Sequence, residues 1–185
     1  MEMKWKTKEV VVIAMVSAVV GVIYTLMDYA YMPLSSLLGT VFMELTFGIY
    51  LLSAALPMYL VRKPGFAIYG ALVTAGVNLL LGSPYGIQLV LAGVLQAIGI
   101  EIGYALFGKY KGNMANITIG AILGALFVLA RDLIVFKTYT YGAGILAGII
   151  VVRLLSAVII GTILIKLISF ALVKTGVMKG FACAK

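Results

Sequence analysis

The chain reads EVVVIAMVSAVVGVIYTLM from Glu9 to Met27, a stretch that is apolar almost throughout. Three lysines precede it and Asp28 follows it. An α-helix needs about 20 apolar residues to cross the hydrocarbon core of a bilayer, so this stretch predicts a membrane-spanning helix. It is too long for a cleaved signal and has no small-residue cleavage site, so we expect the helix to be retained.

Five further stretches of this kind follow, and the composition agrees with a membrane protein. Hydrophobic residues make up 64% of the 185 residues, charged residues make up 11%, and the mean hydropathy is +1.18. A water-soluble fold cannot bury so much apolar surface. We therefore predict one all-α integral membrane domain over residues 1–185, a bundle of six transmembrane helices with no separate soluble domain. The predicted spans are Val10–Met27, Val41–Val61, Phe66–Leu81, Gln88–Phe107, Ile117–Phe136 and Ile145–Leu172.

The positions of the basic residues predict the orientation in the membrane. If the N-terminus is cytoplasmic, the outer loops carry only Lys137, whereas eleven basic residues lie at the inner ends. Both termini of this multi-pass protein of the cell membrane are therefore expected in the cytoplasm. The net charge of +8 then belongs to the cytoplasmic face, and nucleic acid need not be invoked. The inner basic residues are Lys4, Lys6, Lys8, Arg62, Lys63, Lys109, Lys111, Lys166, Lys174, Lys179 and Lys185.

The residue types that the chain lacks exclude several kinds of chemistry. It has no histidine and a single cysteine, Cys183, which removes His-based metal sites, zinc sites and disulfides. No GxxxxGK[ST] sequence occurs, so the chain does not bind ATP through a P-loop. An intramembrane enzyme is disfavoured because no nucleophile lies near a base. We predict no enzymatic activity, no cofactor and no metal, with the energy for active transport coming from an ion gradient or another subunit.

Polar side chains inside a membrane span are costly unless they are paired or functional. Counted at about 1.5 Å per residue from the span ends, most of them lie in the outer half or near the middle of the membrane. This distribution predicts a polar pocket that opens to the outside. The candidate substrate-binding residues are Glu44, Thr74, Asn78, Gln96 and Asp132.

Some of these polar residues also have a purely structural interpretation. Thr74 and Asn78 share one helix face, which fits a pocket wall, but hydrogen bonds between helices explain the pair about as well. A solvated helix end is the alternative for Glu44. Glu101 and Arg153 match in depth within one helical turn, which predicts a structural ion pair between the fourth and sixth spans.

Arg131 and Asp132 are adjacent and point about 100° apart on their helix. One of them can therefore reach the lipid headgroups while the other faces the bundle. A solvated outer end and a role in binding both remain open for this pair.

Small residues follow one face of the first span. Ala14, Ser17, Ala18 and Gly21 have the spacing i, i+3, i+4 and i+7, which lets another helix approach closely. In a protein with many spans such patterns usually serve internal packing. The alternative is a surface for a membrane partner, with Ala14, Ala18 and Gly21 as the candidate contact residues.

Six short motifs along the whole chain resemble those of one known family. They are WKxKEV from Trp5, VRKPG at Val61–Gly65, GSPYG at Gly82–Gly86, QxxGxE at Gln96–Glu101, VRLLS at Val152–Ser156 and LVKTGV at Leu172–Val177. In this order and spacing they are similar to the YkoE-type family. These proteins are the substrate-binding S components of energy-coupling factor (ECF) transporters, assigned to thiamine and its hydroxymethylpyrimidine precursor.

The resemblance implies a six-helix S-component fold with a vitamin pocket beneath the outer loop between the first two helices. It implies partners as well: a membrane-embedded T component and two ABC-type ATPase subunits, which would supply ATP hydrolysis. Ala14 and Ala18 match the Ala-x-x-x-Ala pattern through which S components contact the T component. The expected function is capture of a thiamine-related vitamin or precursor for ATP-driven uptake. The alternative is a stand-alone ion-coupled secondary transporter that uses Glu101 and Arg153.

The chain departs from the family pattern in the third span. Members that resemble thiamine binders carry acidic residues there, where this chain has Ala71 and Asn78. Thiamine bears a fixed positive charge, which Asn78 does not neutralise. The departure favours a neutral ring such as hydroxymethylpyrimidine, with Glu44 and Asp132 as the remaining counter-charges for thiamine.

Overall fold

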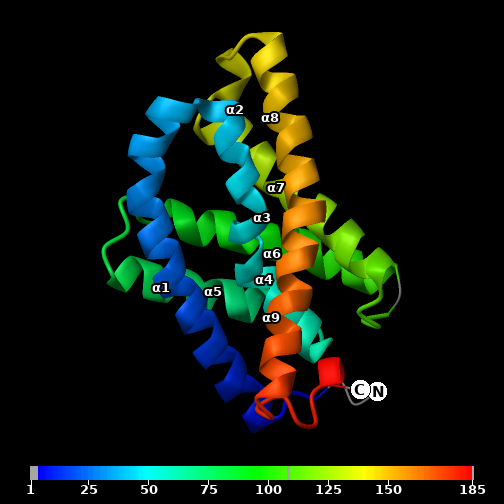
Figure 1. Cartoon of the computed structure of the whole chain (residues 1–185). Helices are drawn as coiled ribbons and strands as arrows, with labels where there is room; N and C mark the ends of the chain where they lie inside the picture. The colour runs from blue at the N-terminus through cyan, green and yellow to red at the C-terminus, as the bar shows by residue number, and fades with distance from the viewer. Residues whose placement is uncertain (1–3, 108, 185) are drawn as a thin grey trace.

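The structure is a computed structural model that describes residues 4–107 and 109–184, and this part of the chain contains helices and no strand. The all-α prediction is therefore confirmed. The two termini lie at one end of the molecule, whereas α2 and the beginning of α8 lie at the other (Figure 1). The α-helices are α1 (Thr7–Leu38), α2 (Thr40–Met43), α3 (Phe47–Tyr50), α4 (Leu52–Val61), α5 (Phe66–Leu80), α6 (Gln88–Leu106), α7 (Met114–Val135), α8 (Ala143–Ser156) and α9 (Thr162–Lys174).

Within the part of the chain that the structure describes, five helical stretches are long and apolar enough to cross a membrane, and α5 is a shorter apolar helix. The count of six spans therefore stays a prediction. The five stretches are Thr7–Leu38, Thr40–Val61, Gln88–Leu106, Met114–Val135 and Ala143–Lys174.

Helix α1 continues well beyond Met27, where the sequence argument ended it because a charged residue follows. In the structure Asp28 is buried and accepts hydrogen bonds from three neutral side chains, so its charge does not end the helix. The loop that follows is short, because α2 begins at Thr40 directly after Gly39.

Two stretches cross the bundle as broken helices. Between Thr40 and Val61, a 3₁₀ segment (η1, Glu44–Thr46) interrupts the α-helical geometry, and between α8 and α9 a π-helical segment (η3, Ala157–Gly161) does so. The two irregular regions meet, because the Ser156 hydroxyl accepts from the Gly48 N–H (2.9 Å) and donates to the Leu45 carbonyl (2.6 Å). Irregular helical turns often occur at functional sites, since they redirect side chains.

Glycines allow α6 and α7 to pack in close contact. A Cβ added at Gly99 would lie 2.6 Å from the backbone nitrogen of Gly124, and one at Gly103 would lie 2.6 Å from Gly120. These small-xxx-small pairs therefore serve internal packing, as is usual in proteins with many spans. The same contacts fix the antiparallel register of the two helices.

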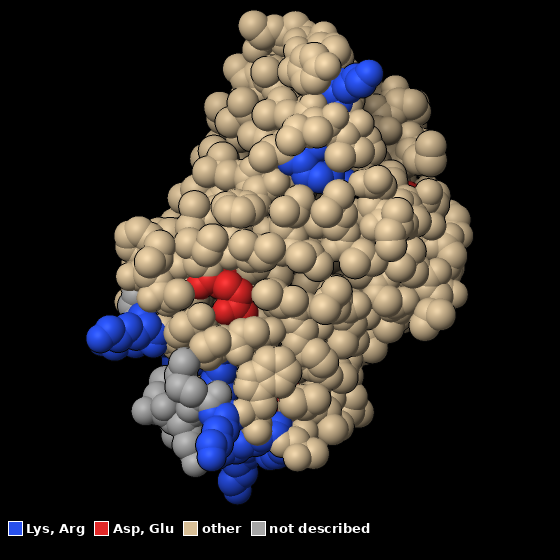
Figure 2. All heavy atoms as spheres, turned by 180° about the vertical axis from the view of Figure 1, so that it is seen from behind, with Lys and Arg blue, Asp and Glu red and all other residues tan. Residues whose placement is uncertain are grey.

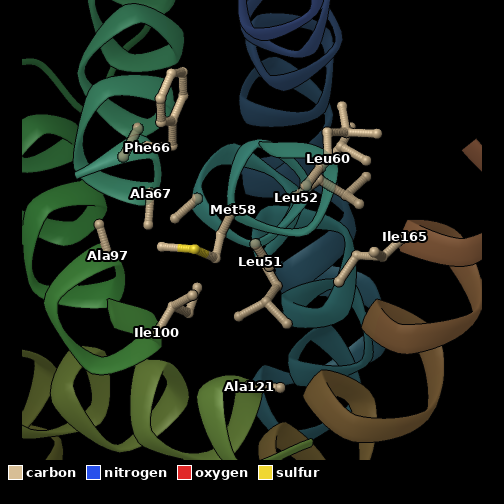
Figure 3. Close-up of a cluster of buried hydrophobic side chains, with 14 of the residues drawn as sticks. Leu51, Leu52, Met58, Leu60, Phe66, Ala67, Ala97, Ile100, Ala121 and Ile165 are labelled. Carbon is tan, nitrogen blue, oxygen red and sulfur yellow. The ribbon is translucent and has the colours of Figure 1, made fainter. Parts of the chain in front are cut away.

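The apolar core surrounds α4, which lies among the longer helices. Figure 3 shows Met58 extending toward Ala67, Ala97 and Ile100, with Leu51 beside it. The side chains of Leu51, Met58 and Ile100 are 0% exposed. This core holds the second, broken span in place between α5, α6 and α9, and thereby positions Glu44 at the start of that span.

The basic residues are distributed as expected for a membrane protein with both termini on one side. On the face shown in Figure 2, Lys and Arg side chains gather mostly at the end where the termini lie, an acidic patch lies nearer the middle, and a few basic side chains lie toward the other end. Lys63 is buried rather than solvent-exposed and forms an ion pair with Glu9 (2.7 Å). The cytoplasmic placement of this end remains a prediction.

Candidate substrate-binding pocket

A cavity of about 460 Å³ occupies the half of the bundle that lies away from the termini. Its walls come from α1, the broken second span, α5, α6, α7, the 3₁₀ turn after α7 (η2, Thr138–Thr140) and α8. This volume lies within the range of small-molecule sites. All of the substrate-binding candidates named from the sequence line it, namely Glu44, Thr74, Asn78, Gln96 and Asp132. Their role in binding stays a prediction.

Arg153 joins two of these candidates in a buried ionic cluster. Its guanidinium donates to both carboxylate oxygens of Glu44 (2.6 and 2.8 Å) and to Asp132 Oδ2 (2.6 Å). The three side chains are only 7–8% exposed. Bidentate geometry of this kind gives the strongest hydrogen bonds between arginine and carboxylate. The cluster therefore ties α8 to the second span and to α7.

The predicted ion pair of Glu101 with Arg153 is wrong. Glu101 instead accepts hydrogen bonds from the backbone N–H groups of Gly65 (2.8 Å) and Ala67 (3.1 Å) at the start of α5. A carboxylate at a helix N-terminus satisfies N–H groups that have no partner within the helix.

Tyr110, in the turn after α6, donates the remaining hydrogen bond to Glu101 (3.2 Å). Burial and the neighbouring carboxylate raise the pKa of Tyr110 to about 12, so the phenol remains a donor at neutral pH. Glu101 thus holds the end of α5 against α6 and takes no part in the pocket.

Thr74 and Asn78 combine the two interpretations that the sequence left open. Both line the cavity, and both also connect α5 to α1. Thr74 donates to the Ser17 carbonyl (3.1 Å), and Asn78 accepts from Thr25 (2.8 Å) and donates to Asp28 (2.9 Å).

Gln96 of α6 likewise lines the cavity and forms hydrogen bonds to another helical segment. Its amide donates to the Tyr50 carbonyl (3.0 Å) and to Ser53 (3.3 Å), at the break between α3 and α4. These contacts orient the side chain without closing the cavity that it lines.

Asp28 is a pocket residue that the sequence analysis missed. It is 1% exposed, and it accepts from Tyr50 (2.8 Å), Asn78 (2.9 Å) and Ser83 (2.7 Å). All three donors are neutral, and within the described residues no cation pairs with this carboxylate. A signal was available, because Tyr24, Asp28 and Tyr31 are spaced i, i+4 and i+7 and so share one face of α1.

Aromatic side chains make up much of the remaining wall. Tyr31 and Tyr85 form an edge-to-face pair with ring centroids 6.2 Å apart, and both line the cavity. Burial, followed by the charge of Asp28, raises the pKa of Tyr85 above its usual value. Aromatic walls of this kind suit a planar heteroaromatic ligand, since rings attract one another in stacked and edge-to-face arrangements.

The small residues on one face of α1 differ in their surroundings: Gly21 packs against α5, whereas Ala14 and Ala18 are partly exposed. Gly21 is buried, and a Cβ added there would lie 2.8 Å from the Thr74 carbonyl oxygen, so Gly21 allows α5 to pack closely. The prediction that Gly21 contacts a partner is therefore wrong. Ala14 and Ala18 are only half-buried, and the nearby Val11 and Val19 are exposed.

Comparison with known proteins places this pocket in a transporter subunit. A family model described as "ABC-type cobalt transport system, permease component" matches residues 8–127. A putative HMP/thiamine permease protein, YkoE of Bacillus subtilis (strain 168), is 32% identical over 98% of this chain and 91% of its own. The crystal structure of an S component of an ECF transporter superposes with a TM-score of 0.92 at 28% identity, covering 98% of this chain and 92% of that one.

The chain belongs to the YkoE family of ECF S components. The resemblance inferred from the six sequence motifs is thereby confirmed. S components are membrane proteins that bind substrates and are not enzymes, so the family agrees with the transport function expected from the sequence. As a member of this family, the chain is a multi-pass subunit of a membrane transporter.

Proposed function

We propose that this S component captures hydroxymethylpyrimidine or thiamine from outside the cell and presents it for ATP-driven uptake. The termini would lie in the cytoplasm, so the pocket would open outward. A membrane-embedded T component and two ABC-type ATPase subunits would complete the transporter, with Ala14 and Ala18 on the surface that meets the T component. The relative named as an HMP/thiamine permease supports this substrate class.

The observation that carries the proposal is the uncompensated carboxylate of Asp28 beside the aromatic wall. Among the described residues, three carboxylates line the cavity, Asp28, Glu44 and Asp132, against two guanidinium groups, Arg131 and Arg153. With all five ionised, the lining has one net negative charge. A buried carboxylate with only neutral partners favours a ligand that brings a positive charge or a strong hydrogen-bond donor.

Asp28 also supplies a carboxylate near the third span, where this chain lacks the acidic residues of its relatives. The third span lacks the acidic residues of thiamine-binding relatives, but Asn78 on that span contacts Asp28 of α1 (2.9 Å). A carboxylate therefore lies at this wall although another helix supplies it. Both thiamine and hydroxymethylpyrimidine carry an aminopyrimidine ring, whose amino group is a donor suited to such a carboxylate. Thiamine, with its fixed charge, is a candidate equal to the neutral precursor.

Cobalt, the metal in the name of the matching family model, is a poor fit to these residues. The chain has no histidine, and its single cysteine lies near the C-terminus, far along the chain from the cavity residues. Cobalt is held well by imidazole and thiolate ligands. Within the described residues, no group of three or more His, Cys, Asp or Glu side chains is arranged to hold a metal ion.

The structure does not favour the alternative of a stand-alone ion-coupled carrier. It depended on Glu101 and Arg153 as an ionisable couple, and these side chains bind different partners. No other observation favours it.

The test is direct measurement of binding to the purified protein. Isothermal titration with thiamine and with hydroxymethylpyrimidine should give saturable binding of at least one of them. Asp28→Asn should weaken thiamine binding by about 10-fold or more, because a charge-assisted contact is worth about 1.5–3 kcal/mol. Glu9→Gln, which changes a carboxylate at the other end of α1, should leave affinity unchanged. Failure of the wild type to bind either compound would reject the proposed substrate.

A further inference from the structure

One wall of the pocket contains buried polar atoms that lack hydrogen-bond partners. They are Gln88 Oε1, Arg131 Nε and Thr138 Oγ1. Asp132 Oδ1 beside them makes no hydrogen bond of good geometry, although it lies 2.8 Å from Arg131 Nη2 in an ion pair. Other buried atoms without partners occur among the described residues, at Ser17, Tyr104, Asn116 and Thr162, but none of those residues lines the cavity. Unpaired buried donors and acceptors are costly, and they are rare unless a ligand or water satisfies them.

The register of α6 and α7 brings these atoms to one place. Gly103 lies against Gly120 and Gly99 against Gly124, which places Gln88 level with residue 135 of α7. Gln88 is therefore about one helical turn from Asp132 along the bundle. Thr138 follows in the turn directly after α7.

Asp28 and Glu44 differ from these atoms, because all their oxygens already have protein partners. Both oxygens of Asp28 accept from neutral side chains, and both oxygens of Glu44 accept from Arg153. An oxygen of Asp28 can still accept a further hydrogen bond from a donor on the ligand, whereas Gln88 Oε1, Arg131 Nε and Thr138 Oγ1 have no hydrogen-bond partner at all.

The kinds of unpaired atom indicate which ligand group fits. Arg131 Nε–H can only donate, Gln88 Oε1 and Asp132 Oδ1 can only accept, and the Thr138 hydroxyl can do both. An alcohol is the small group that donates one hydrogen bond and accepts others at the same time. A methyl group offers neither, and a phosphate ester offers mainly acceptors.

The charge of this wall also favours an alcohol over a phosphate ester as the bound group. The guanidinium groups at this wall are already balanced, because Arg153 pairs with Glu44 and Asp132, and Arg131 lies 2.8 Å from Asp132. No surplus positive charge is left to compensate a phosphate dianion, and Asp132 would repel it.

We propose that Gln88, Arg131, Asp132 and Thr138 form a subsite for an uncharged hydroxyl group on the ligand, and that this subsite excludes phosphate esters. The inference rests on the proposed function and specifies it. On this basis the protein takes up the free alcohol, and any reaction that phosphorylates the ligand must follow transport.

Three pyrimidines test the subsite, namely 4-amino-5-hydroxymethyl-2-methylpyrimidine, its analogue with a 5-methyl group in place of the hydroxymethyl group, and its phosphate ester. Titration of the purified wild type should show that the 5-methyl analogue and the phosphate ester each bind at least about 10-fold more weakly than the alcohol, which corresponds to the loss of one or two hydrogen bonds.

Thr138→Val keeps the shape of the side chain and removes its hydroxyl. It should weaken binding of the alcohol by about 3- to 10-fold and leave binding of the 5-methyl analogue unchanged. The matched control is Thr140→Val in the same turn, because the Thr140 hydroxyl already donates to the Lys137 carbonyl (2.8 Å) and does not line the cavity. This control should bind both compounds as the wild type does. Thermal unfolding of each variant verifies that it is folded.

The outcomes separate the subsite from the proposed function. Equal affinity of the wild type for the alcohol and the 5-methyl analogue, or tighter binding of the phosphate ester, would overturn the subsite and leave the pocket in place. If thiamine and all the pyrimidines fail to bind, the proposed function and the subsite both fall. An equal loss for both pyrimidines in Thr138→Val would assign Thr138 to the structure of the turn.

Discussion

Replacing Glu44 by glutamine should destabilise the protein strongly, because Glu44 holds the buried guanidinium of Arg153. The variant loses the charge that accepts two hydrogen bonds of 2.6 and 2.8 Å, and Arg153 keeps only Asp132, which also lies against Arg131. The side chains are 7–8% exposed, so solvent screens the pair little. Breaking a buried ion pair by removing one partner typically costs about 3–5 kcal/mol, and we expect a loss in the free energy of unfolding within that range.

The measurement is reversible unfolding in mixed micelles, with increasing SDS and a helical signal as the readout. Glu101→Gln is the matched control, because its amide oxygen can still accept from Gly65 and Ala67, and its expected cost is below about 1 kcal/mol.

A double variant, Glu44→Gln with Arg153→Gln, removes both charges of the pair. It should lose less stability than the sum of the two single variants, since neither charge is left without its partner. An equal loss for Glu44→Gln and Glu101→Gln, or additivity in the double variant, would refute the assignment of Arg153 to Glu44.

Three further predictions concern the packing, the partner surface and the orientation. Gly21→Ala should destabilise the protein by about 1–3 kcal/mol in the same unfolding assay, because its Cβ would lie 2.8 Å from the Thr74 carbonyl oxygen, whereas Gly76→Ala has no atom within 4 Å and should be neutral. Ala14→Trp combined with Ala18→Trp should retain vitamin affinity but lose co-purification with the T component and ATP-dependent uptake; normal transport would reject this surface. A single cysteine at the exposed position Tyr139 should react with membrane-impermeant maleimide in intact cells, and protection from the reagent would reverse the orientation.

The fold was largely predictable because its strongest determinants are local. Long apolar runs gave the positions of the helices, and the predicted spans Phe66–Leu81 and Gln88–Phe107 end within a residue of α5 and α6. Glycines at i, i+4 spacing allow the close contact of α6 with α7, although the spacing alone does not say which helices meet. The breaks in the second and last helices carried no comparable signal, since their geometry depends on contacts such as that of Ser156 with Gly48.

The pocket was predictable only in part, because depth in the membrane does not determine which way a side chain points. Glu101 and Arg153 matched in estimated depth, but helices extend beyond the bundle by different lengths. Helix α8 begins beyond α2 (Figure 1), so Arg153, well along α8, lies level with Glu44 near the start of the second span. Asp28 was missed for a related reason: its charge was taken to mark the end of the first span, whereas the helix continues past Asp28 and buries it.

Helix α1 connects the pocket to the proposed partner surface without an intervening loop. Asp28 and Tyr31 line the cavity, whereas Ala14 and Ala18 lie toward the end that carries the termini. The distance from Asp28 to Ala14 is about 21 Å at 1.5 Å per residue. Between them, Thr25, Gly21 and Ser17 bind or pack against α5, which itself carries Asn78 in the pocket wall. Because the hydrogen bond of 2.9 Å between Asn78 and Asp28 joins these helices in the pocket wall, a ligand that contacts either residue would act on both helices. Helix α1 then also carries the surface on which the T component is proposed to bind.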